Sequence, residues 1–182
     1  MELKAHIMDE SDVRRALIRI SHEIVENNKG TEGICLIGII SRGKPLADII
    51  RSNIEKIEGV KVPCGELDIR FYRDDLSLEN ENPKLRNAEL GFSVENKKII
   101  LVDDVIYTGR TARAAIEAVF SFGRPASIQM AVLVDRGHRE LPIRADYVGK
   151  NIPTSRNEIV KVNIPPYDMP PARVTLYERD IL

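Results

Sequence analysis

Hydrophobic residues between Asp9 and Asn28 recur every three or four positions, which is the spacing of one face of an α-helix. The positions on this face are Val13, Leu17, Ile20 and Ile24. Side-chain oxygens that can cap the start of such a helix are found at Asp9, Ser11 and Asp12. The pattern predicts an amphipathic helix that packs its hydrophobic face against the core.

A continuous hydrophobic run rich in β-branched residues lies at residues 34–40, and mainly hydrophobic runs lie at residues 98–102 and 128–134. Runs of this kind are typical of strands that are buried on both faces, as the strands of parallel sheets are. Helical patterns at residues 46–57 and 108–122 alternate with them. This alternation predicts an α/β fold with a central, mainly parallel sheet flanked by helices.

The rest of the chain has a less regular pattern. Residues 67–71 alternate between hydrophobic and polar and predict a strand, whereas residues 73–96 are polar and rich in turn-forming side chains. We expect this polar stretch to be a mobile loop or hairpin. Further short strands are predicted at residues 145–148, 159–164 and 173–177, around segments rich in glycine, proline and charge.

Composition narrows the class of protein. A length of 182 residues favours a single domain over residues 1–182, and 43% hydrophobic residues suffice for a packed core. Lys plus Arg total 27 and Asp plus Glu total 28, so the net charge of −1 allows a nucleic-acid surface only as a local patch.

Because no membrane-spanning run or signal peptide is recognisable, we expect a cytoplasmic protein with no membrane partner. Cys35 and Cys64 lack the spacing of a metal site.

The most informative stretch reads KKIILVDDVIYTGRTARAA. A predicted buried strand ends in Asp103 and Asp104, and a loop with Thr108, Gly109 and Thr111 opens a helix. The unpaired amides and the dipole at a helix start favour a phosphate, and glycine lets it approach the main chain. Carboxylates would repel that phosphate, so the two aspartates suit sugar hydroxyls instead. The loop therefore predicts a sugar-phosphate site, with an ordinary helix cap after strand-ending aspartates as the alternative.

The segment ILVDDVIYTGRTARAA resembles the phosphoribosyl pyrophosphate (PRPP) signature of the type I phosphoribosyltransferases. Similarity over most of the chain, strongest over residues 98–157, is to members that regulate pyrimidine operons by attenuation and retain uracil phosphoribosyltransferase activity. The resemblance implies the type I phosphoribosyltransferase fold, with a small hood subdomain at about residues 135–157 and a flexible loop at about residues 73–96. It also implies conversion of uracil and PRPP to UMP and diphosphate.

The resemblance implies roles for residues at matching positions. The residues implied to bind PRPP or UMP are Ser41, Arg42, Asp103, Asp104, Val105, Ile106, Tyr107, Thr108, Gly109, Arg110, Thr111, Arg136 and Val160. The residues implied to be catalytic are Arg42, Arg73, Asp103 and Asp104. The aspartates would hold the ribose hydroxyls and residues 108–111 the 5′-phosphate. Ser41 and Arg42 would hold the diphosphate, whereas Arg136 and Val160 would lie beside the base. Mg²⁺ would be held by PRPP oxygens, so no dedicated protein cage for a metal is expected.

The resemblance further implies binding to the leader of pyr messenger RNA. The residues predicted to contact it are Arg14, Arg15, Arg19, His22, Arg144, Lys150 and Arg156. Helical geometry gives an independent indication. At about 100° per residue, Arg15, Arg19 and His22 share the helix face opposite the hydrophobic face. The alternative is a solvated surface, since Glu23 and Glu26 border that face.

The function implied by the resemblance has alternatives at this stage. UMP or UTP would bind the PRPP site and favour the RNA-binding state, which would couple RNA binding to the pyrimidine supply. A purely metabolic phosphoribosyltransferase, acting on uracil or a purine without binding RNA, is the main alternative, and a regulator with vestigial catalysis is another. A homodimer or a larger homo-oligomer is expected from relatives.

Overall fold

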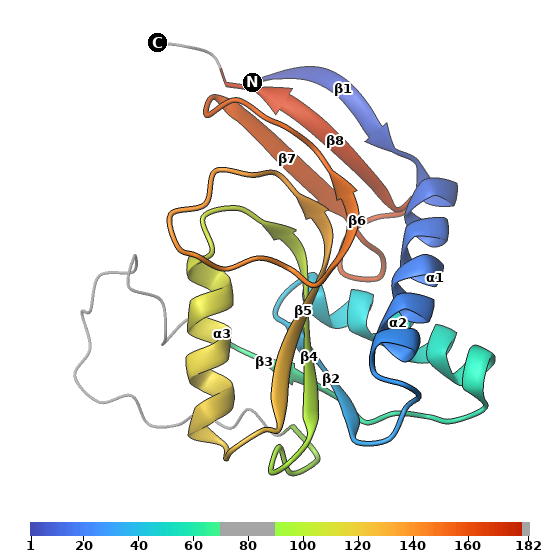
Figure 1. Cartoon of the computed structure of the whole chain (residues 1–182). Coiled ribbons are helices and arrows are strands. Elements are labelled where there is room, and N and C mark those ends of the chain that lie inside the picture. Colours follow the sequence, from blue (N-terminus) through green and yellow to red (C-terminus); the bar gives the residue numbers. More distant parts are fainter. Residues whose placement is uncertain (70–89, 180–182) are drawn as a thin grey trace.

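The computed structural model describes residues 1–69 and 90–179 of the chain. Within these residues, its core is a five-stranded parallel sheet with the order β3-β2-β4-β5-β6 (Figure 1). The strands are β2 (Ile34–Ile39), β3 (Cys64–Leu67), β4 (Lys98–Ile106), β5 (Ser127–Asp135) and β6 (Tyr147–Asn151). Every residue of β2 is buried, because both faces of the sheet are covered. The predicted α/β fold with a mainly parallel sheet is confirmed.

Helices pack on both faces of this sheet. They are α1 (Glu10–Asn27), α2 (Gly43–Glu58) and α3 (Arg110–Ser121). Figure 1 shows α1 and α2 on one face and α3 on the other, and the hydrophobic side chains of the two faces form separate clusters. The predicted amphipathic helix is α1, and its cap is Asp9, whose carboxylate accepts a hydrogen bond of 2.8 Å from the Asp12 amide.

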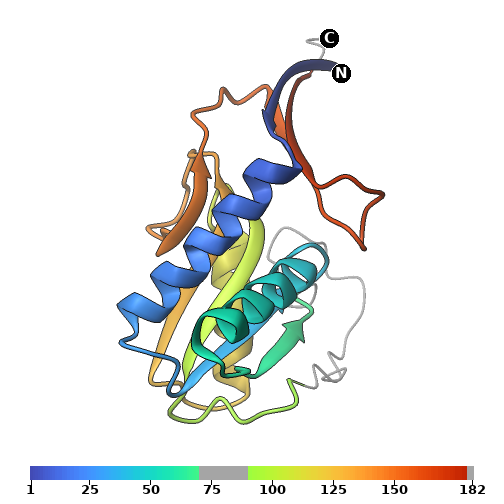
Figure 2. The same ribbon diagram turned by 90° about the vertical axis from the view of Figure 1, so that its right-hand side faces the viewer.

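A second, antiparallel sheet with the order β1-β8-β7 lies beyond the carboxyl ends of the main strands (Figures 1 and 2). Its strands are β1 (Glu2–Met8), β7 (Glu158–Asn163) and β8 (Arg173–Glu178). The small subdomain therefore comes from the two ends of the chain rather than from residues 135–157. That prediction is wrong because the segment contains β6, which pairs in parallel with β5 and extends the main sheet.

Other predicted boundaries shift by a few residues. Of the strand predicted at residues 67–71, residues 70 and 71 lie outside the described residues, and the short strand β3 ends at Leu67. Residues 73–89 of the predicted mobile loop lie outside the described residues. The last part of that stretch is packed rather than loose, because Leu90 and Val94 are buried in the α3-side cluster. Among the described residues, no helix has the length and hydrophobicity needed to cross a membrane.

Candidate functional site

The two aspartates of the PRPP-like motif lie in the carboxyl-terminal half of β4. Asp103 is buried, and its Oδ1 accepts a hydrogen bond of 2.9 Å from the Asp104 amide. Asp104 Oδ1 accepts a hydrogen bond of 2.8 Å from the Val105 amide. Burial raises the pKa of Asp104, and the hydrogen bonds and the positive charge of Arg42 oppose that rise. The sheet thus holds two carboxylates at the edge where ligands of α/β proteins bind. Asp103 is buried, and the carboxylate of Asp104 is poorly solvated.

The loop after β4 encloses a cavity of about 340 Å³. The residues around it are Asp103, Val105, Ile106, Tyr107, Thr108, Gly109, Arg110, Thr111, Ala112, Met130 and Glu140. Gly109 precedes α3 with a φ of 95°, a left-handed conformation that favours glycine, and it provides no side-chain cap. The Thr108 hydroxyl accepts a hydrogen bond of 3.4 Å from the Arg110 amide. The amides at the start of α3 are therefore beside a space that can hold an anion.

Arg110 and Glu140 form an ion pair at this cavity that the sequence does not indicate. Arg110 Nε lies 2.9 Å from Glu140 Oε2, and the Glu140 amide donates a hydrogen bond of 2.9 Å to the Thr108 carbonyl. The Glu140 side chain is 54% exposed, so it can turn toward solvent. Contact of Arg110 with a phosphate stays a prediction.

The predicted diphosphate loop lies directly against β4. A Cβ on Gly43 would lie 2.2 Å from the Val102 carbonyl oxygen, so the close approach requires a glycine there. Arg42 comes immediately before α2, and its guanidinium is bound by the carboxylate of Asp168 from the loop between β7 and β8. Asp168 raises the pKa of Arg42, and Asp104 adds to that rise. Arg42 is therefore a charged group between the second sheet and the two aspartates.

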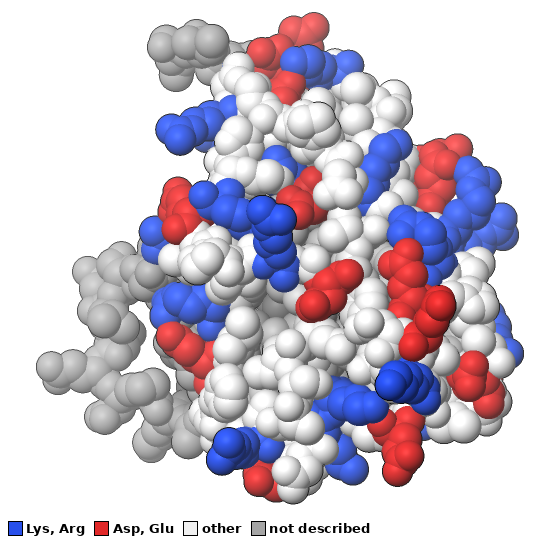
Figure 3. Space-filling view, viewed as in Figure 1, with Lys and Arg blue, Asp and Glu red and all other residues white. Residues whose placement is uncertain are grey.

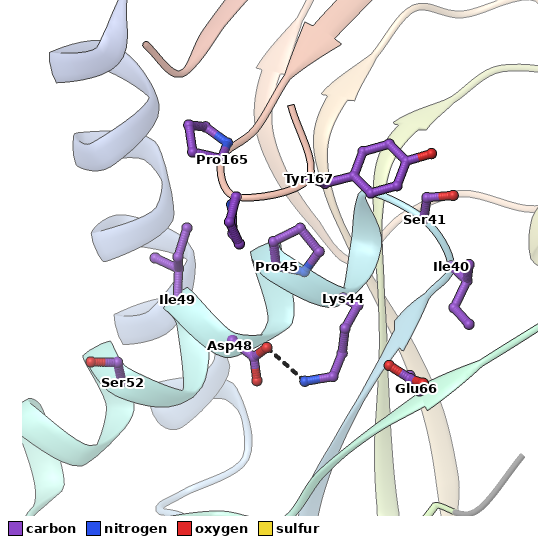
Figure 4. Close-up of a pocket in the computed structure, with 11 residues that line it drawn as sticks. Ile40, Ser41, Lys44, Pro45, Asp48, Ile49, Ser52, Glu66, Pro165 and Tyr167 are labelled. Carbon is purple, nitrogen blue, oxygen red and sulfur yellow. Dashed lines mark hydrogen bonds and ion pairs between the residues drawn. The ribbon is translucent and has the colours of Figure 1, made fainter. Parts of the chain in front are cut away.

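Ser41 lies at a different cavity from the β4 loop. This cavity, of about 590 Å³, is bounded by the start of α2 and by residues 165–167 (Figure 4). Its wall includes Lys44 and Asp48, which form an ion pair of 2.6 Å, and the side chain of Tyr167 extends toward Ser41. Of the two predicted diphosphate ligands, Arg42 interacts electrostatically with Asp104, whereas Ser41 lines this second cavity.

Arg136, predicted to contact a nucleotide, is buried and engaged within the protein. Its guanidinium carbon lies 4.0 Å from the centre of the Tyr107 ring, and Nη2 donates a hydrogen bond of 2.8 Å to the Glu158 carbonyl. Val160, on β7, is half-buried and packs against the core on the α1 and α2 side. Arg136 thereby joins the PRPP-like loop to the start of β7. Its contact with a base, and that of Val160, stays a prediction.

Arg73, the remaining predicted catalytic residue, lies outside the described residues. Within the described ranges 1–69 and 90–179, no group of three or more His, Cys, Asp or Glu side chains is arranged to hold a metal ion. Asp103 and Asp104 nevertheless supply carboxylate oxygens, which are the ligand type that Mg²⁺ prefers. This donor set fits a magnesium ion that is held mainly by oxygens of its substrate.

The predicted RNA-binding residues are only partly brought together. Arg19 Nη2 donates a hydrogen bond of 2.6 Å to the Gly149 carbonyl, and Lys150 Nζ donates one of 3.2 Å to the Ile7 carbonyl. Arg15 pairs with Asp12. The hydrogen bond from the Asp9 amide lowers the pKa of the Asp12 carboxyl, and the positive charges of Arg15 and Lys150 add to this effect. Figure 3 shows Lys and Arg side chains over the upper part of α1, mixed with acidic ones. Arg15, Arg19 and Lys150 define a basic face of α1 and β6 that acidic side chains interrupt; its binding to RNA stays a prediction, and Arg19 also has a structural role in it.

Three of the predicted RNA contacts lie away from or at the edge of this basic face. Arg14 lines a groove of about 420 Å³ that is bounded by α1, by Ile49 of α2 and by the connection between β7 and β8. Arg144 lies in the connection between β5 and β6, and Arg156 in that between β6 and β7. In Figure 1 both connections extend to the side of the sheet away from α1. His22 lies on α1 and is exposed.

Arg139 is a structural residue of the site that sequence reasoning missed. Its guanidinium donates hydrogen bonds to the carbonyls of Tyr107, at 2.7 Å, and Ile143, at 2.8 Å, and it pairs with the Asp135 carboxylate. It thereby fixes the segment after β5 against the PRPP-like loop. An arginine in a charged, irregular segment gives no local signal of this role.

Comparison with known proteins agrees with this geometry. Residues 6–167 match the phosphoribosyl transferase domain family. The protein is 64% identical to the Bifunctional protein PyrR of Caldicellulosiruptor bescii over 168 residues, which cover 92% of each chain. It is 58% identical to the Bifunctional protein PyrR of Clostridium perfringens, covering 92% of this chain and 94% of the relative. Among solved structures, the hypoxanthine phosphoribosyltransferase of Trypanosoma cruzi has the same fold, with a TM-score of 0.73, 20% identity and coverage of 97% and 98%.

The fold and the site thus define a phosphoribosyltransferase, and the chain belongs to that family. Within the family it groups with the bifunctional PyrR proteins. The resemblance seen in the sequence is confirmed.

Proposed function

We propose that this protein is a uracil phosphoribosyltransferase that also binds the leader of pyr messenger RNA, with UMP or UTP as the signal. One observation carries the enzymatic part: the cavity at the end of β4 brings Asp103 and residues 105–111 together in a chain 58–64% identical to bifunctional PyrR proteins. The cavity has the donors and acceptors that a ribose phosphate requires.

In the proposed reaction the protein mainly binds and orients PRPP. The carboxylates of Asp103 and Asp104 accept hydrogen bonds from the ribose hydroxyls, and the amides of residues 108–111 hold the 5′-phosphate. Arg42 holds the diphosphate, which leaves with the electron pair of its bond to C1 of the ribose, while a uracil nitrogen that has given up its proton to solvent bonds to that carbon. Mg²⁺, held mainly by PRPP oxygens, would neutralise the negative charge of the leaving diphosphate.

The regulatory part of the proposal uses the same cavity. UMP keeps the ribose and the 5′-phosphate of PRPP, so it fits the loop that binds the substrate. Arg139 bonds this loop to the segment that leads into β6, and Arg19 bonds β6 to α1. A nucleotide that orders the loop would thereby favour one arrangement of the basic face formed by α1 and β6.

Base specificity is tested by steady-state assays with PRPP and each candidate base. We expect turnover of uracil and at least about 100-fold lower kcat/KM for hypoxanthine and guanine, since a site built for one set of polar groups rejects bases that leave them unpaired. Efficient purine turnover without uracil turnover would replace this proposal with the metabolic alternative.

RNA binding is tested by titrating labelled pyr leader RNA at several salt concentrations, with and without UMP. Arg15→Ala and Lys150→Ala should each weaken binding and lower the slope of log affinity against log salt by about 1, because each removes one phosphate contact. Lys61→Ala, an exposed lysine between α2 and β3, is the matched control and should keep the wild-type slope. Equal RNA affinity with and without UMP would contradict the regulatory part.

We also propose that the protein acts in the cytoplasm as a homodimer or a larger homo-oligomer. Exposed hydrophobic side chains around the cavity of about 590 Å³, at Ile40, Ile49 and Tyr167, support an interface between copies of the chain. The proposed RNA-binding role supports a location where the messenger is transcribed.

A further inference from the structure

The loop between β7 and β8, residues 164–172, reaches from the second sheet to the start of α2. There Asp168 Oδ2 accepts a hydrogen bond of 2.8 Å from Arg42 Nε, and Asp168 Oδ1 accepts one of 2.9 Å from Arg42 Nη2. The guanidinium carbon lies 5.1 Å from the centre of the Tyr167 ring. Figure 4 shows Pro165 and Tyr167 of this loop beside Ser41 and the first turn of α2. A residue 126 positions away along the chain thus fixes the Arg42 side chain.

Asp168 is itself held firmly by its own loop. Its Oδ2 accepts a hydrogen bond of 2.8 Å from the Ile164 amide, and its amide donates one of 2.9 Å to the Ile164 carbonyl. Its side chain is 16% exposed, whereas that of Arg42 is 37% exposed. The anchored partner is therefore the carboxylate, and the guanidinium is the partner that still faces an open space.

The geometry of the pair leaves part of the guanidinium available. An arginine side chain has five N–H donors, and this bidentate contact uses the edge formed by Nε and Nη2. The opposite edge, with Nη1, is not used by Asp168. The charge of Arg42 also acts on Asp104 at the ribose side of the site. The unused edge therefore belongs to a cation whose charge already acts on one of the two aspartates proposed to hold the ribose.

We propose that Asp168 is a positioning residue for the transferase: it holds one edge of the Arg42 guanidinium so that the other edge binds the diphosphate of PRPP. This inference rests on the proposed function, because it needs PRPP as the ligand. A free arginine loses side-chain conformational entropy when it binds an anion, and a guanidinium that is already fixed loses less. The structural loop of the second sheet thereby contributes to the affinity for one group of the substrate.

The test compares calorimetric affinities for PRPP, with Mg²⁺ present, and for UMP, which lacks the diphosphate. Asp168→Asn keeps the shape and can still accept from the Ile164 amide, but it loses the second charged oxygen. We expect about 10-fold weaker PRPP binding and less than about 2-fold change for UMP, because only PRPP uses Arg42 in this way. Asp48→Asn, which alters a carboxylate on α2 paired with Lys44, is the matched control and should change neither affinity.

A double-mutant cycle separates positioning from a general structural role. In an Arg42→Ala background, Asp168→Asn should have no further effect on PRPP affinity, because the group it positions is gone. Unchanged PRPP affinity in the single variant, equal weakening of PRPP and UMP, or a persistent effect in the Arg42→Ala background would overturn the inference. Failure of the proposed function looks different, since wild type would then bind PRPP normally and fail to convert uracil.

Discussion

Gly43→Ala is expected to destabilise the protein by about 3 kcal/mol and to reduce turnover of PRPP and uracil by about 100-fold. The added Cβ would lie 2.2 Å from the Val102 carbonyl oxygen, 3.2 Å from its carbonyl carbon and 3.3 Å from the Asp103 Cα. All of these are backbone atoms of β4, the central strand, so they cannot move aside as a side chain can. The loop that carries Arg42 must therefore shift away from the aspartates.

Urea denaturation measures the stability part of this prediction, and steady-state kinetics measures the catalytic part. Gly59→Ala is the matched control. It has no heavy atom within 4 Å of the added Cβ, but its φ of 71° makes alanine unfavourable by about 1 kcal/mol. We expect this control to lose stability and keep its kcat/KM. A Gly43→Ala protein with wild-type kinetics would show that the close approach of the loop to β4 is unnecessary for activity.

The main sheet could be predicted because its information is local. The runs at residues 34–40, 98–102 and 128–134 are hydrophobic on both faces, and that composition is required where helices cover both sides of a parallel sheet. The motif from Asp103 to Thr111 was visible for the same reason, since strand, loop and helix start are contiguous. Contiguous features of this kind specify both the element and its place in the fold.

Two strands of the second sheet, β7 and β8, match the strands predicted at residues 159–164 and 173–177, but their assembly with β1 could not be predicted because it depends on partners far apart in the sequence. Among the described strands β1 pairs only with β8, with Glu2 opposite Glu178, and most of its side chains remain exposed or half-buried. Its sequence therefore lacks the alternation of a half-buried strand. Asp168 gives no local signal either, because it lies in a proline-rich connection and its partner, Arg42, is 126 positions away along the chain.

The candidate site was predicted in composition but not in its internal contacts. Arg110 and Arg136 were expected to face ligands, yet the structure pairs the first with Glu140 and stacks the second on Tyr107. A sequence motif records which residues surround a ligand. It does not record which groups satisfy those side chains before the ligand arrives, because the partners come from segments with no motif of their own.

Asp104→Asn should weaken the binding of UMP and PRPP by about 1–3 kcal/mol, which is roughly 5-fold to 150-fold, because a charged hydrogen bond to the ribose is lost. The fold should remain, since the asparagine oxygen can still accept from the Val105 amide as Asp104 Oδ1 does at 2.8 Å. Calorimetry with each ligand measures the loss. Glu117→Gln, on the outer face of α3, is the matched control and should bind both ligands as wild type does. Wild-type affinity in Asp104→Asn would remove this carboxylate from the ribose site.

The same substitution should increase stability near neutral pH, which distinguishes a functional carboxylate from a structural one. Burial raises the pKa of Asp104 in the folded state, so the ionised carboxylate lowers the free energy of unfolding at pH values above that raised pKa. Asparagine removes this cost. As the pH falls through the folded-state pKa toward the ordinary carboxyl range, wild type becomes protonated and the advantage of the variant should disappear. Urea denaturation at neutral and acidic pH measures the difference, and a variant less stable than wild type at neutral pH would mean that Asp104 is retained for folding rather than for binding a sugar.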